Sequence, residues 1–497
     1  MTPYGNGATF VDLGIDDAPD RAARTYALAE ALREAWPAAD VIVGAGVVVV
    51  VGVGGGEIAR VARSAAITRA AGPVRTHAIT SVYDGPDLAA VAEALGVAPD
   101  EVIARHTEAD HLVELVGFLP GFAYLAIPGG SRLAVPRRAS PRPRVPAGSI
   151  AVAAGFTGIY PLASPGGWSL IGRAIDAVPF DPARDPAALF APGDRVRFVA
   201  VGDEFADARG SSALADARGS VERDDVVTGL VVIAAPACAT VQDRGRAGQL
   251  GRGIPPSGPL DVETFAAANV AVGNRAGAAA IEVPLGALEV EARGLEVLVS
   301  IDGQPAIRLH DGERLRVPEG ARAVRYLAVR GGVAVPEVLG ARATLLAAGL
   351  GGHLGRTLRR RDLLPIGDEE GAELEPAQPG PIGSEEALAI DPGPHVERFP
   401  PDAYEVLLGT SWRVSRLGDR VGVRLEGGRV PREGPDRALP VPMLRGAVEI
   451  TTDGTPIVLG PDHPTTGGYP VLAVLRASAQ AALARKRPGE AVRFRSA

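Results

Sequence analysis

Residues 206–220 read ADARGSSALADARGS, so the hexapeptide ADARGS occurs twice within fifteen residues. Low-complexity sequence of this kind is typical of a linker between folded units. We therefore place a linker over residues 204–225, which divides the 497-residue chain into two halves. The repetitive linker suggests that two proteins are fused in one chain.

The first half begins with an alternation of helical and strand-like patterns. Residues 20–36 and 57–71 have the apolar periodicity of helices, and the valine-rich residues 41–53 are typical of strands. We therefore expect a small α/β domain over residues 1–75.

A β-domain is expected to follow over residues 76–203. Within it, residues 85–107 predict two helices separated by a Gly-Val-Ala-Pro turn. After Phe118, short strands are separated by proline and glycine, a pattern typical of a compact β-domain.

The second half consists of further short strands and Gly/Pro turns. Its residues 376–394, PAQPGPIGSEEALAIDPGP, predict a second linker. We expect one β-domain over residues 226–375 and another over residues 395–497. The predicted fold class is mainly β with an N-terminal α/β domain.

Composition narrows the classes of function. Hydrophobic residues make up 46% of the chain and charged residues 22%, which is ordinary for a globular protein. The net charge of −8 argues against a general nucleic-acid binder and against a polybasic membrane surface. The single cysteine, Cys238, cannot form an internal disulfide. The N-terminus lacks the pattern of a signal peptide, and the longest apolar run, residues 41–56, is shorter than a membrane span. We expect a soluble cytoplasmic protein.

The lysine content excludes more classes of site than any single motif does, because Lys486 is the only lysine of the chain. A P-loop needs a lysine that reaches the β- and γ-phosphates, so that site is excluded. Schiff-base chemistry would depend on Lys486 alone. We expect no covalently bound biotin in this chain, because biotin is attached to a lysine.

Two apparent motifs favour ordinary structure. Residues 52–57, GVGGGE, follow a valine run as a Rossmann turn does, but glutamate stands where the third glycine belongs and no acidic residue follows at the expected distance. A glycine-rich connection from strand to helix is the better interpretation. The seven histidines show no metal-ligand spacing, and His106 and His111 are interpreted as surface or satisfied histidines.

Residues 133–149, LAVPRRASPRPRVPAGS, contain four arginines and four prolines with no acidic residue. Proline fixes a loop before binding, and the arginine fork suits carboxylate or phosphate oxygens. The neighbouring GFLPGFAYL (117–125) and GFTGIYPLASPGGWSLIGR (155–173) combine glycines with aromatic rings that would shape a pocket. Two interpretations are weighed about equally: a preorganised anion site, and a loop whose arginines pair with carboxylates elsewhere in the fold.

The second half contains similar polar turns. Residues 240–274 place a glutamine, an aspartate and arginines among glycines, and their PPSGPLD stretch leads into a helix with Ser257 or Asp261 as a plausible N-cap. Residues 460–470, GPDHPTTGGYP, place polar residues beside a glycine pair. Turns of this kind are usually only β-turns, so they raise the odds of a site moderately.

These stretches together resemble a known family. Residues 76–198, with GFLPGFAYL, VPRRASPRPRVPAGSIAV and TGIYPLASPGGWSLIGR, resemble the B subunit of 5-oxoprolinase, the KipI or allophanate-hydrolase-subunit-1 family. Residues 231–497, with TVQDRGRAGQLGRGIPPSGPLD, ANVAVGN, YLAVRGG, GVRLEG and TTGGYP, resemble the C subunit of 5-oxoprolinase, the KipA or allophanate-hydrolase-subunit-2 family. The two follow each other in family order across the linker.

The resemblance implies cyclophilin-like β-barrel domains in both halves and an active site between them, as in the carboxyltransferase part of urea carboxylase. It implies an ATP-dependent amidohydrolase that opens the lactam 5-oxo-L-proline to L-glutamate, with Mg²⁺ accompanying the nucleotide. A separate partner is expected, the LamB/YcsF-type A subunit of 5-oxoprolinase, and a homo-oligomer is compatible with the sequence. Fixed arginines are suited to the charge that develops on phosphoryl and lactam oxygens.

The resemblance also implies site residues, and no metal ligand is among them. The preferred catalytic candidates are Arg137, Arg138, Asp243 and Arg246. The binding positions of the first half are Gly117, Phe118, Pro120, Gly121, Tyr124, Pro136, Arg144, Tyr160, Gly166, Gly167 and Trp168. Those of the second half are Gln242, Gly245, Ser257, Gly258, Asp261, Thr465, Thr466, Gly467, Gly468 and Tyr469.

Three stretches depart from the family pattern. Residues 339–345 read LGARATL where the family usually has LGSRSTD, so two hydroxyls are lost. In the first half, GRAI (172–175) replaces the usual GRTP. Residues 446–459 have Glu449 where glutamine is usual, and an ionised carboxylate only accepts hydrogen bonds whereas glutamine also donates. If one of these positions binds substrate, the substrate has drifted.

Two alternative functions stay open. The first is a biotin-dependent carboxyltransferase acting on urea or a related amide, with the biotin carrier on another chain. The second is a KipI/KipA-type regulatory module that binds a histidine kinase. Fusion of an inhibitor to its antagonist counts against the second alternative.

Overall fold

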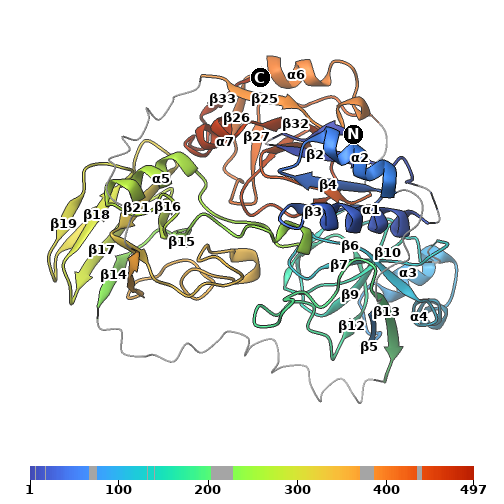
Figure 1. Cartoon of the computed structure of the whole chain (residues 1–497). Coiled ribbons are helices and arrows are strands. Elements are labelled where there is room, and N and C mark those ends of the chain that lie inside the picture. The colour runs from blue at the N-terminus through green and yellow to red at the C-terminus, as the bar shows by residue number, and fades with distance from the viewer. Residues whose placement is uncertain are drawn as a thin grey trace.

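The computed structural model describes residues 1–5, 7–16, 18, 20–65, 75–130, 133–138, 140–202, 228–369, 386–433 and 439–497. They form an N-terminal domain, a closed barrel and two further β-domains (Figure 1). The predicted fold class, mainly β with an N-terminal α/β domain, is confirmed. The predicted linker 204–225 lies outside the described residues. No helix within the described ranges is long and apolar enough to cross a membrane.

The N-terminal domain is an antiparallel sheet with two helices. Its elements are β1 (Thr2–Pro3), β2 (Ala8–Asp12), α1 (Arg21–Ala35), β3 (Asp40–Val43), β4 (Val47–Val51) and α2 (Gly55–Ala65). The strands pair in the order β1-β2-β4-β3. Because the pairing is antiparallel, the glycines after β4 belong to a strand-to-helix connection and not to the parallel sheet of a Rossmann unit.

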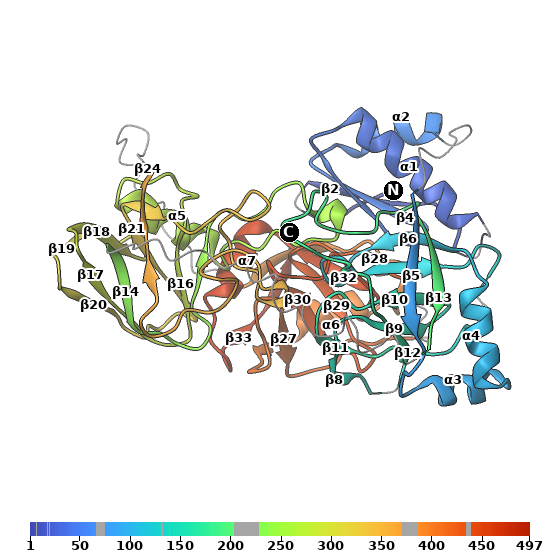
Figure 2. The same ribbon diagram turned by 90° about the horizontal axis from the view of Figure 1, so that it is seen from below.

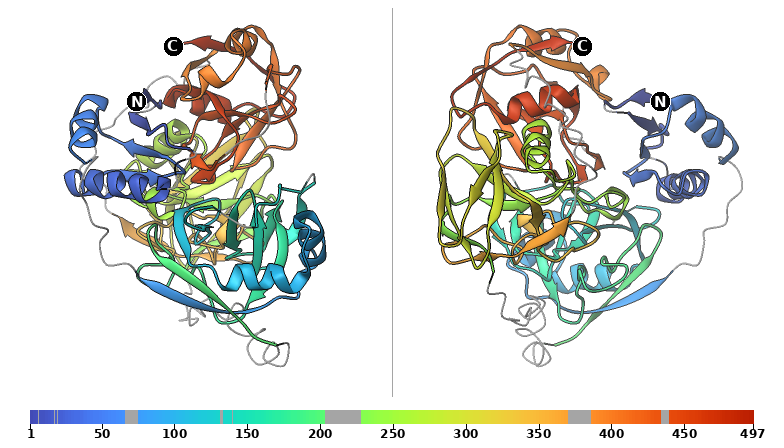
Figure 3. Two further views of the ribbon diagram at one scale, coloured as in Figure 1. Left: turned by 90° about the vertical axis from the view of Figure 1, so that its right-hand side faces the viewer. Right: turned by 60° about the vertical axis from the view of Figure 1, so that its left-hand side comes forward.

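Burial on both faces explains the run of five valines in β4. Val48 and Val50 belong to a core shared with α1 and with one end of the barrel. Val47 and Val49 belong to a second core, shared with the C-terminal domain. A strand that is covered on both faces has a continuous apolar run instead of an alternating one. The N-terminal sheet is therefore a layer between its own helices and the C-terminal domain (Figure 3).

The first half continues with a closed barrel whose strand order is β10-β7-β6-β13-β5-β12-β9. The two helices predicted over residues 85–107 are confirmed as α3 and α4, and β8 and β11 form a separate ribbon. The elements are β5 (Thr76–Val82), α3 (Leu88–Leu95), α4 (Pro99–Thr107), β6 (His111–Val116), β7 (Ala123–Ala126), β8 (Arg142–Val145), β9 (Ser149–Ala153), β10 (Phe156–Ile159), β11 (Ser164–Gly166), β12 (Ser169–Ala174) and β13 (Arg195–Ala200).

The histidine pair of the barrel is buried and has structural partners. His106 Nδ1 lies 2.7 Å from the Tyr83 hydroxyl, and its Nε2 lies 3.2 Å from Thr157 Oγ1. His111 Nε2 lies 2.9 Å from the backbone oxygen of His106. Burial lowers the pKa of both imidazoles. The surface interpretation is wrong, because both histidines are buried. The satisfied interpretation is confirmed for His106, whereas His111 Nδ1 has no hydrogen-bond partner among the described residues.

The second half begins with a domain of two sheets, β20-β17-β14-β23 and β15-β16-β21-β18-β19, which enclose one core. Asp261 is the N-cap of α5, because its side chain accepts a hydrogen bond from the backbone of Thr264. The elements are β14 (Gly229–Ala234), β15 (Thr240–Gln242), η2 (Leu250–Arg252), α5 (Val262–Ala271), β16 (Ala280–Pro284), β17 (Leu288–Arg293), β18 (Val297–Ile301), β19 (Ile307–Leu309), β20 (Arg314–Val317), β21 (Val324–Val329), β22 (Gly331–Val333), η3 (Leu346–Ala348), β23 (Leu363–Leu364) and β24 (Ile366–Glu369).

The C-terminal domain is built on an eight-stranded sheet, β33-β26-β27-β30-β29-β32-β25-β34, with its own core. Figure 2 shows this domain between the preceding domain at one end of the molecule and the barrel at the other. The elements are β25 (Leu388–Pro392), η4 (Val396–Arg398), α6 (Ala403–Gly409), β26 (Trp412–Val414), β27 (Gly422–Glu426), β28 (Val441–Pro442), β29 (Ala447–Ile450), β30 (Pro456–Leu459), β31 (Thr466–Gly467), β32 (Val471–Leu475), α7 (Ala477–Ala484), β33 (Ala491–Val492) and β34 (Phe494–Ser496).

The linker predicted over residues 376–394 is wrong for its last part. Strand β25 falls inside it, pairs with β32 and β34, and buries Leu388 and Ile390 completely. Its short apolar run LAI is flanked by glutamate, proline and glycine, and that composition conceals the strand. Residues 376–385 lie outside the described residues.

A segment of the second half reaches into the first half. Residues 244–258, here called the arm, carry η2 against the edge strand β3. A Cβ atom on Gly251 would lie only 2.6 Å from the Val41 backbone oxygen, so the contact requires glycine. Ile254 of the arm joins a small core with Phe180 of the barrel and Leu345 of the second half. The two halves are therefore interlocked by contacts that do not involve the linker.

Candidate functional site

Motif residues of both halves meet where the arm, the barrel and the C-terminal domain come together. A Cβ atom on Gly117 of the barrel would lie 2.1 Å from Thr466 Oγ1 and 2.8 Å from Thr465 Oγ1. A Cβ atom on Gly253 of the arm would lie 3.2 Å from the Gly117 backbone nitrogen. We call Gly117, Tyr124, Gly253, Thr465 and Thr466 the junction site. Two of its glycines allow three segments from three domains to approach one another.

Local backbone structure places the two threonines. Strand β31 pairs with β28, where Thr466 is opposite Pro442. The backbone oxygen of Thr465 accepts a 2.9 Å hydrogen bond from Met443. The Thr466 side chain is near enough to the Tyr124 hydroxyl to influence its pKa, but Thr466 Oγ1 has no hydrogen-bond partner among the described residues. Burial raises the pKa of Tyr124, while Arg137 and Thr466 act in the opposite direction.

Aromatic rings form the wall behind Tyr124. The Phe122 ring lies 5.1 Å from that of Tyr124 and 5.4 Å from those of Tyr160 and Trp168, all in edge-to-face orientation. Such pairs hold one another in fixed orientations. A Cβ atom on Gly166 would lie 2.2 Å from the Tyr160 hydroxyl, so this glycine is needed for the ring to fit. The predicted aromatic positions thus support the junction site from within the first half.

The arginines of the Arg/Pro segment divide into two groups. Arg138 Nη1 lies 3.0 Å from Asp87 Oδ1, and Arg142 contacts both carboxylate oxygens of Asp87 at 2.8 and 2.7 Å. The Asp87 carboxylate also accepts a 2.7 Å hydrogen bond from the backbone of Leu170. Burial raises the pKa of Asp87, but the arginines and this backbone group outweigh it and lower the pKa. These two arginines are paired with a carboxylate elsewhere in the fold, as the second interpretation predicted.

Arg137 is placed differently. Its side chain is exposed, and its charge acts on the buried Tyr124 and Tyr160 hydroxyls. Burial raises the pKa of Tyr160 to about 12, and Arg137 opposes that rise. Arg144 is also exposed but shows no such relation to the tyrosines. Among the predicted arginines of this segment, Arg137 is therefore the one whose charge acts on the tyrosine of the junction site.

The other first-half positions contribute backbone and shape. A Cβ atom on Gly121 would lie 2.6 Å from Phe180 Cβ, so this glycine permits a close approach of two loops. Phe118 has a left-handed backbone with φ of 66° and places its ring 5.4 Å from that of Phe122. Pro120 is buried, Gly167 is half-buried and Pro136 is exposed beside Arg137.

In the second half, Asp243 and Arg246 hold one loop. Asp243 accepts hydrogen bonds from the backbone nitrogens of Gly245, Arg342 and Ala343 at 2.9, 2.6 and 3.1 Å. Arg246 donates to the backbone oxygens of Val338 and Ala343 at 3.1 and 2.5 Å. Because these contacts involve only backbone atoms, those of Gly245 and of residues 338–343, they do not depend on the two hydroxyls that LGARATL lacks.

Arg246 is unusual because its guanidinium is almost completely buried and forms no ion pair within the described residues. Burial lowers its pKa, and the charges of Asp243 and Asp462 act against that shift. Its Nη1 atom has no hydrogen-bond partner among the residues that the structure describes. A buried guanidinium nitrogen without a partner is unusual, because buried polar groups are almost always hydrogen-bonded.

Unpartnered polar atoms concentrate on the motif segments of the second half. Eight buried side-chain polar atoms of the described residues have no hydrogen-bond partner, and six of them belong to these segments. The six are Gln242 Oε1, Arg246 Nη1, Gln249 Oε1, Ser257 Oγ, Thr465 Oγ1 and Thr466 Oγ1. Buried polar groups almost always have partners, so such a concentration indicates a place for a bound molecule or water.

The remaining second-half positions lie in the same motif segments as these atoms. The Ser257 backbone has a φ of 59° and donates a 3.1 Å hydrogen bond to the Pro461 oxygen. A Cβ atom on Gly467 would lie 2.8 Å from Met443 Cε, Gly468 is half-buried, and Tyr469 is 36% exposed. The Asp261 carboxylate is occupied by Arg485 as well as by the helix cap, which gives it a structural role. Gln242 donates to Thr240 and Thr344, and Gly258 contacts Arg420 through its backbone oxygen.

Sequence reasoning missed three participants. Gly253 lies within a motif segment but was not among the predicted positions, although its approach to Gly117 completes the junction site. Asp87 lies in the stretch GPDL (85–88), which contributes to the resemblance of the first half, but it was not among the predicted positions. Arg420 lies outside the motif stretches. The role of each is identified only by its partners in space. Among the described residues, no group of three or more histidine, cysteine, aspartate and glutamate side chains could hold a metal ion.

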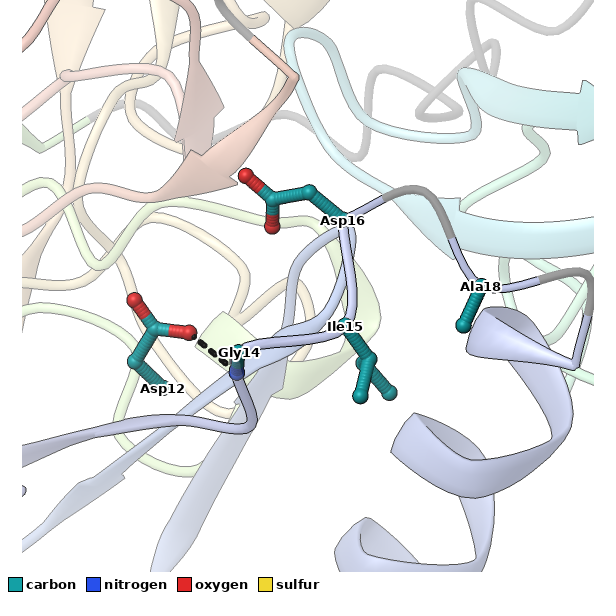
Figure 4. Close-up of a pocket in the computed structure, with 5 residues that line it drawn as sticks. All are labelled: Asp12, Gly14, Ile15, Asp16 and Ala18. Atoms are coloured by element: carbon teal, nitrogen blue, oxygen red, sulfur yellow. Dashed lines mark hydrogen bonds between the residues drawn. The ribbon is translucent and has the colours of Figure 1, made fainter.

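A separate pocket of about 410 Å³ lies in the N-terminal domain, between β2 and α1 (Figure 4). It is lined by Asp12, Gly14, Ile15, Asp16 and Ala18, and a 2.8 Å hydrogen bond joins the Gly14 nitrogen to Asp12. None of the predicted site residues lines it, and the two carboxylates alone do not make a binding site.

Both halves of the chain are similar to carboxyltransferase-type proteins. Carboxyltransferase domain, subdomain C and D, matches residues 1–190, and Carboxyltransferase domain, subdomain A and B, matches residues 252–496. The crystal structure of the protein TTHA0988 is similar over 98% of this chain and 99% of that one, with a TM-score of 0.80 and 31% identity. The urea carboxylase of Kluyveromyces lactis is similar over 54% of this chain and 27% of that one, with a TM-score of 0.50 and 27% identity.

Sequence relatives divide at the linker. The second half is 33% identical to the 5-oxoprolinase C subunit of Escherichia coli (strain K12), over 53% of this chain and 90% of that protein. The first half is 50% identical to the 5-oxoprolinase B subunit of Escherichia coli O157:H7, over 23% of this chain and 52% of that protein. The chain therefore spans about half the length of the B-subunit relatives it matches. It belongs to the carboxyltransferase-domain family of the 5-oxoprolinase B and C subunits, joined here in one chain.

Proposed function

We propose that the chain is the B–C component of an ATP-dependent 5-oxoprolinase, which hydrolyses 5-oxo-L-proline to L-glutamate together with a separate A subunit. The observation that carries the proposal is the junction site. There, Gly117 from the B-type motif is in contact with Thr465 and Thr466 from the C-type motif. The names of the relatives of both halves support the same reaction.

The chemistry explains why ATP is required. A lactam carbonyl is an unreactive amide. Attack of its oxygen on the γ-phosphorus of ATP releases ADP and leaves an electrophilic ring carbon that bears a phosphate group. Water then adds to that carbon, the ring C–N bond breaks as the nitrogen accepts a proton, and an acyl phosphate remains. A second water hydrolyses the acyl phosphate, so the products are glutamate, ADP and inorganic phosphate.

Thr465 and Thr466 of the junction site, together with Arg137 and Ser257, are suited to two parts of this reaction. The exposed guanidinium of Arg137 would bind phosphoryl oxygens, because a planar fork matches their geometry. The unpartnered hydroxyls of Ser257, Thr465 and Thr466 would bind the lactam substrate, since a hydroxyl both donates and accepts. Mg²⁺ on the nucleotide would neutralise phosphate charge, held mainly by phosphate and water oxygens.

The direct test combines the full chain with a LamB/YcsF-type A subunit, ATP, Mg²⁺ and 5-oxo-L-proline, and measures glutamate and ADP. We expect coupled release of both products, which stops when either protein is omitted. Thr466→Val should reduce release, because it removes one junction hydroxyl and keeps the shape. Thr9→Val is the matched control, since Thr9 is a buried threonine of β2 whose hydroxyl makes only a 3.4 Å hydrogen bond. Loss of product release in both variants would contradict the placement of the site.

A biotin-dependent carboxyltransferase is the second candidate, favoured by the similarity to urea carboxylase. It would be supported if the chain consumed carboxybiotin in the presence of urea and released neither glutamate nor ADP in the first assay. A regulatory module whose halves separate is disfavoured, because the arm and the shared cores interlock the halves.

A further inference from the structure

Arg420 lies outside the motif segments of both halves and is buried at the seam between the two domains of the second half. It lies just before β27, and its guanidinium uses all three nitrogens. Nε and Nη2 lie 2.8 and 3.1 Å from the carboxylate oxygens of Asp462. Nη1 lies 2.5 Å from Glu282 of β16, and Nη2 donates to the backbone oxygen of Gly258 at 2.7 Å. One side chain therefore connects three segments.

Glu282 extends the connection into the preceding domain. Its second oxygen accepts hydrogen bonds from the backbone nitrogen of Leu260 and from the Tyr326 hydroxyl, both at 2.8 Å. Its carboxylate is completely buried, so each of these contacts is made away from water. Arg420 thus holds the end of the arm directly, at Gly258, and the residue Leu260 just after the arm indirectly, through Glu282.

The geometry requires a guanidinium and not merely a positive charge. Burial alone would lower the pKa of Arg420, but Asp462 and Glu282 outweigh it and raise the pKa, so the side chain stays charged. A lysine ammonium is a point charge on a flexible stem and cannot span the same acceptors in one plane. The site is therefore specific for arginine.

The segments held by Arg420 are those that carry unpartnered hydroxyls. Gly258 directly follows Ser257, and Asp462 precedes Thr465 and Thr466 in the same short turn. We propose that Arg420 is a positioning residue of the junction site, which fixes the hydroxyl of Ser257 relative to those of the two threonines. The inference rests on the proposed function only for its kinetic consequence.

The principal variant is Arg420→Lys, which keeps the charge beside the two carboxylates. The matched control is Arg356→Lys. Two nitrogens of Arg356 also contact a carboxylate, that of Asp362, at 2.7 and 2.8 Å. This pair lies entirely within the first domain of the second half. Glu282→Gln is a second variant, because it keeps the shape and removes the charge that Arg420 faces. Each protein is first checked for a cooperative unfolding transition.

The first measurement is kcat and KM for glutamate release with the LamB/YcsF-type partner, ATP and Mg²⁺. Misplacement of about 1 Å can lower a rate by about 10²-fold, so we expect Arg420→Lys to lower kcat/KM by a factor of this order. Arg356→Lys should change it by less than about twofold, and Glu282→Gln should fall between the two. An Arg420→Gly variant should recover turnover when guanidinium is added at millimolar concentration, which a purely structural defect would not show. Full turnover in Arg420→Lys, or equal losses in Arg420→Lys and Arg356→Lys, would overturn the proposal.

The second measurement does not depend on the reaction. In Arg420→Lys, hydrogen exchange of the full chain should become faster in residues 253–261 and 460–468 and should stay unchanged in residues 76–200. In Arg356→Lys, exchange should become faster in neither of the first two segments. If the unaltered protein releases no glutamate while this exchange pattern is seen, the proposed function fails and the positioning role stands. If exchange in both segments is unaffected, the positioning role fails whatever the activity.

Discussion

The Arg/Pro segment of the barrel and the arm of the second half give the same signal in sequence, arginines among glycines and prolines. In space they differ. Arg138 and Arg142 of the barrel pair with the carboxylate of Asp87, whereas Arg246 at the start of the arm bonds only backbone oxygens of the described residues and keeps one nitrogen unpartnered. An arginine-rich turn is thus structural where its arginines pair with a carboxylate of the fold. Where no carboxylate pairs with them, the turn is a candidate anion site. The distinction lies in the partner, which the turn itself does not contain.

The largest expected effect separates two adjacent arginines. Arg137→Gln should lower glutamate release by about 10²–10³-fold, as expected when one preorganised donor to a developing negative charge is removed. Its thermal unfolding should be unchanged, because the side chain is exposed. Arg138→Gln is the control and should stay within about twofold of the unaltered rate, since Arg142 still holds Asp87. Steady-state kinetics of both variants check this, and an equal loss in both would erase the distinction.

The next effect concerns stability and the departure at Glu449. This carboxyl is buried in β29, where burial raises its pKa to about 7, with Arg424 acting in the opposite direction. Its charge also raises the pKa of Tyr4 of the N-terminal domain, whose hydroxyl donates a hydrogen bond to the backbone oxygen of Pro442 in the C-terminal domain. Glu449 therefore acts on a residue at a domain interface, and we expect its substitution to change stability more than turnover.

The sign of the pH dependence follows from the raised pKa. The folded protein binds a proton at Glu449 more tightly than the unfolded chain does. The stabilising contribution of this group is therefore fully present below its ordinary pKa of 4.5, and it is lost as the pH rises through about 7. Glu449→Gln should therefore raise the free energy of unfolding by about 3 kcal/mol at pH 8 and by almost nothing at pH 4. Urea unfolding at the two pH values measures this. A loss of turnover with no gain in stability would instead place Glu449 in the site.

The smallest expected effect follows cleavage of the linker. A protease site introduced within residues 206–220 should allow the chain to be cut without separating its halves, because apolar cores join them at the N-terminal sheet and at the arm. Gel filtration should show one species even at about 1 M salt, where charge interactions are strongly screened. Separation into two species would show that the linker, and not the interlocked contacts, keeps the halves together.

Local patterns predicted much of the fold. The two helices of residues 85–107 and the strand-to-helix connection after the valine run follow from periodicity and glycine placement within short windows. The valine run itself was recognised as strand, but its burial on both faces depends on the C-terminal domain, nearly 400 residues further along the chain. Strand β25 was hidden because its apolar run is short and is paired by strands from the end of the sequence.

The site was predicted as two sets of motif residues, and their roles could not be assigned from sequence. Whether an arginine of the Arg/Pro segment is paired depends on Asp87, about 50 residues earlier in the chain. The contact of Gly117 with Thr466 joins residues from different halves, and local sequence contains no signal for it. Resemblance supplied the candidates, and spatial partners distinguished structural members from those with unpartnered atoms.

The central claim, that the two halves build one site, is tested most directly by a double-mutant cycle across the junction. Glutamate release is measured for the unaltered protein, Gly117→Ala, Thr466→Ala and the double variant. Because the added Cβ would collide with Thr466 Oγ1, Gly117→Ala should lower turnover strongly, and removal of the threonine side chain should restore part of it. The account predicts a coupling free energy above about 1 kcal/mol. Effects that add within about 0.5 kcal/mol would contradict a site shared by the two halves.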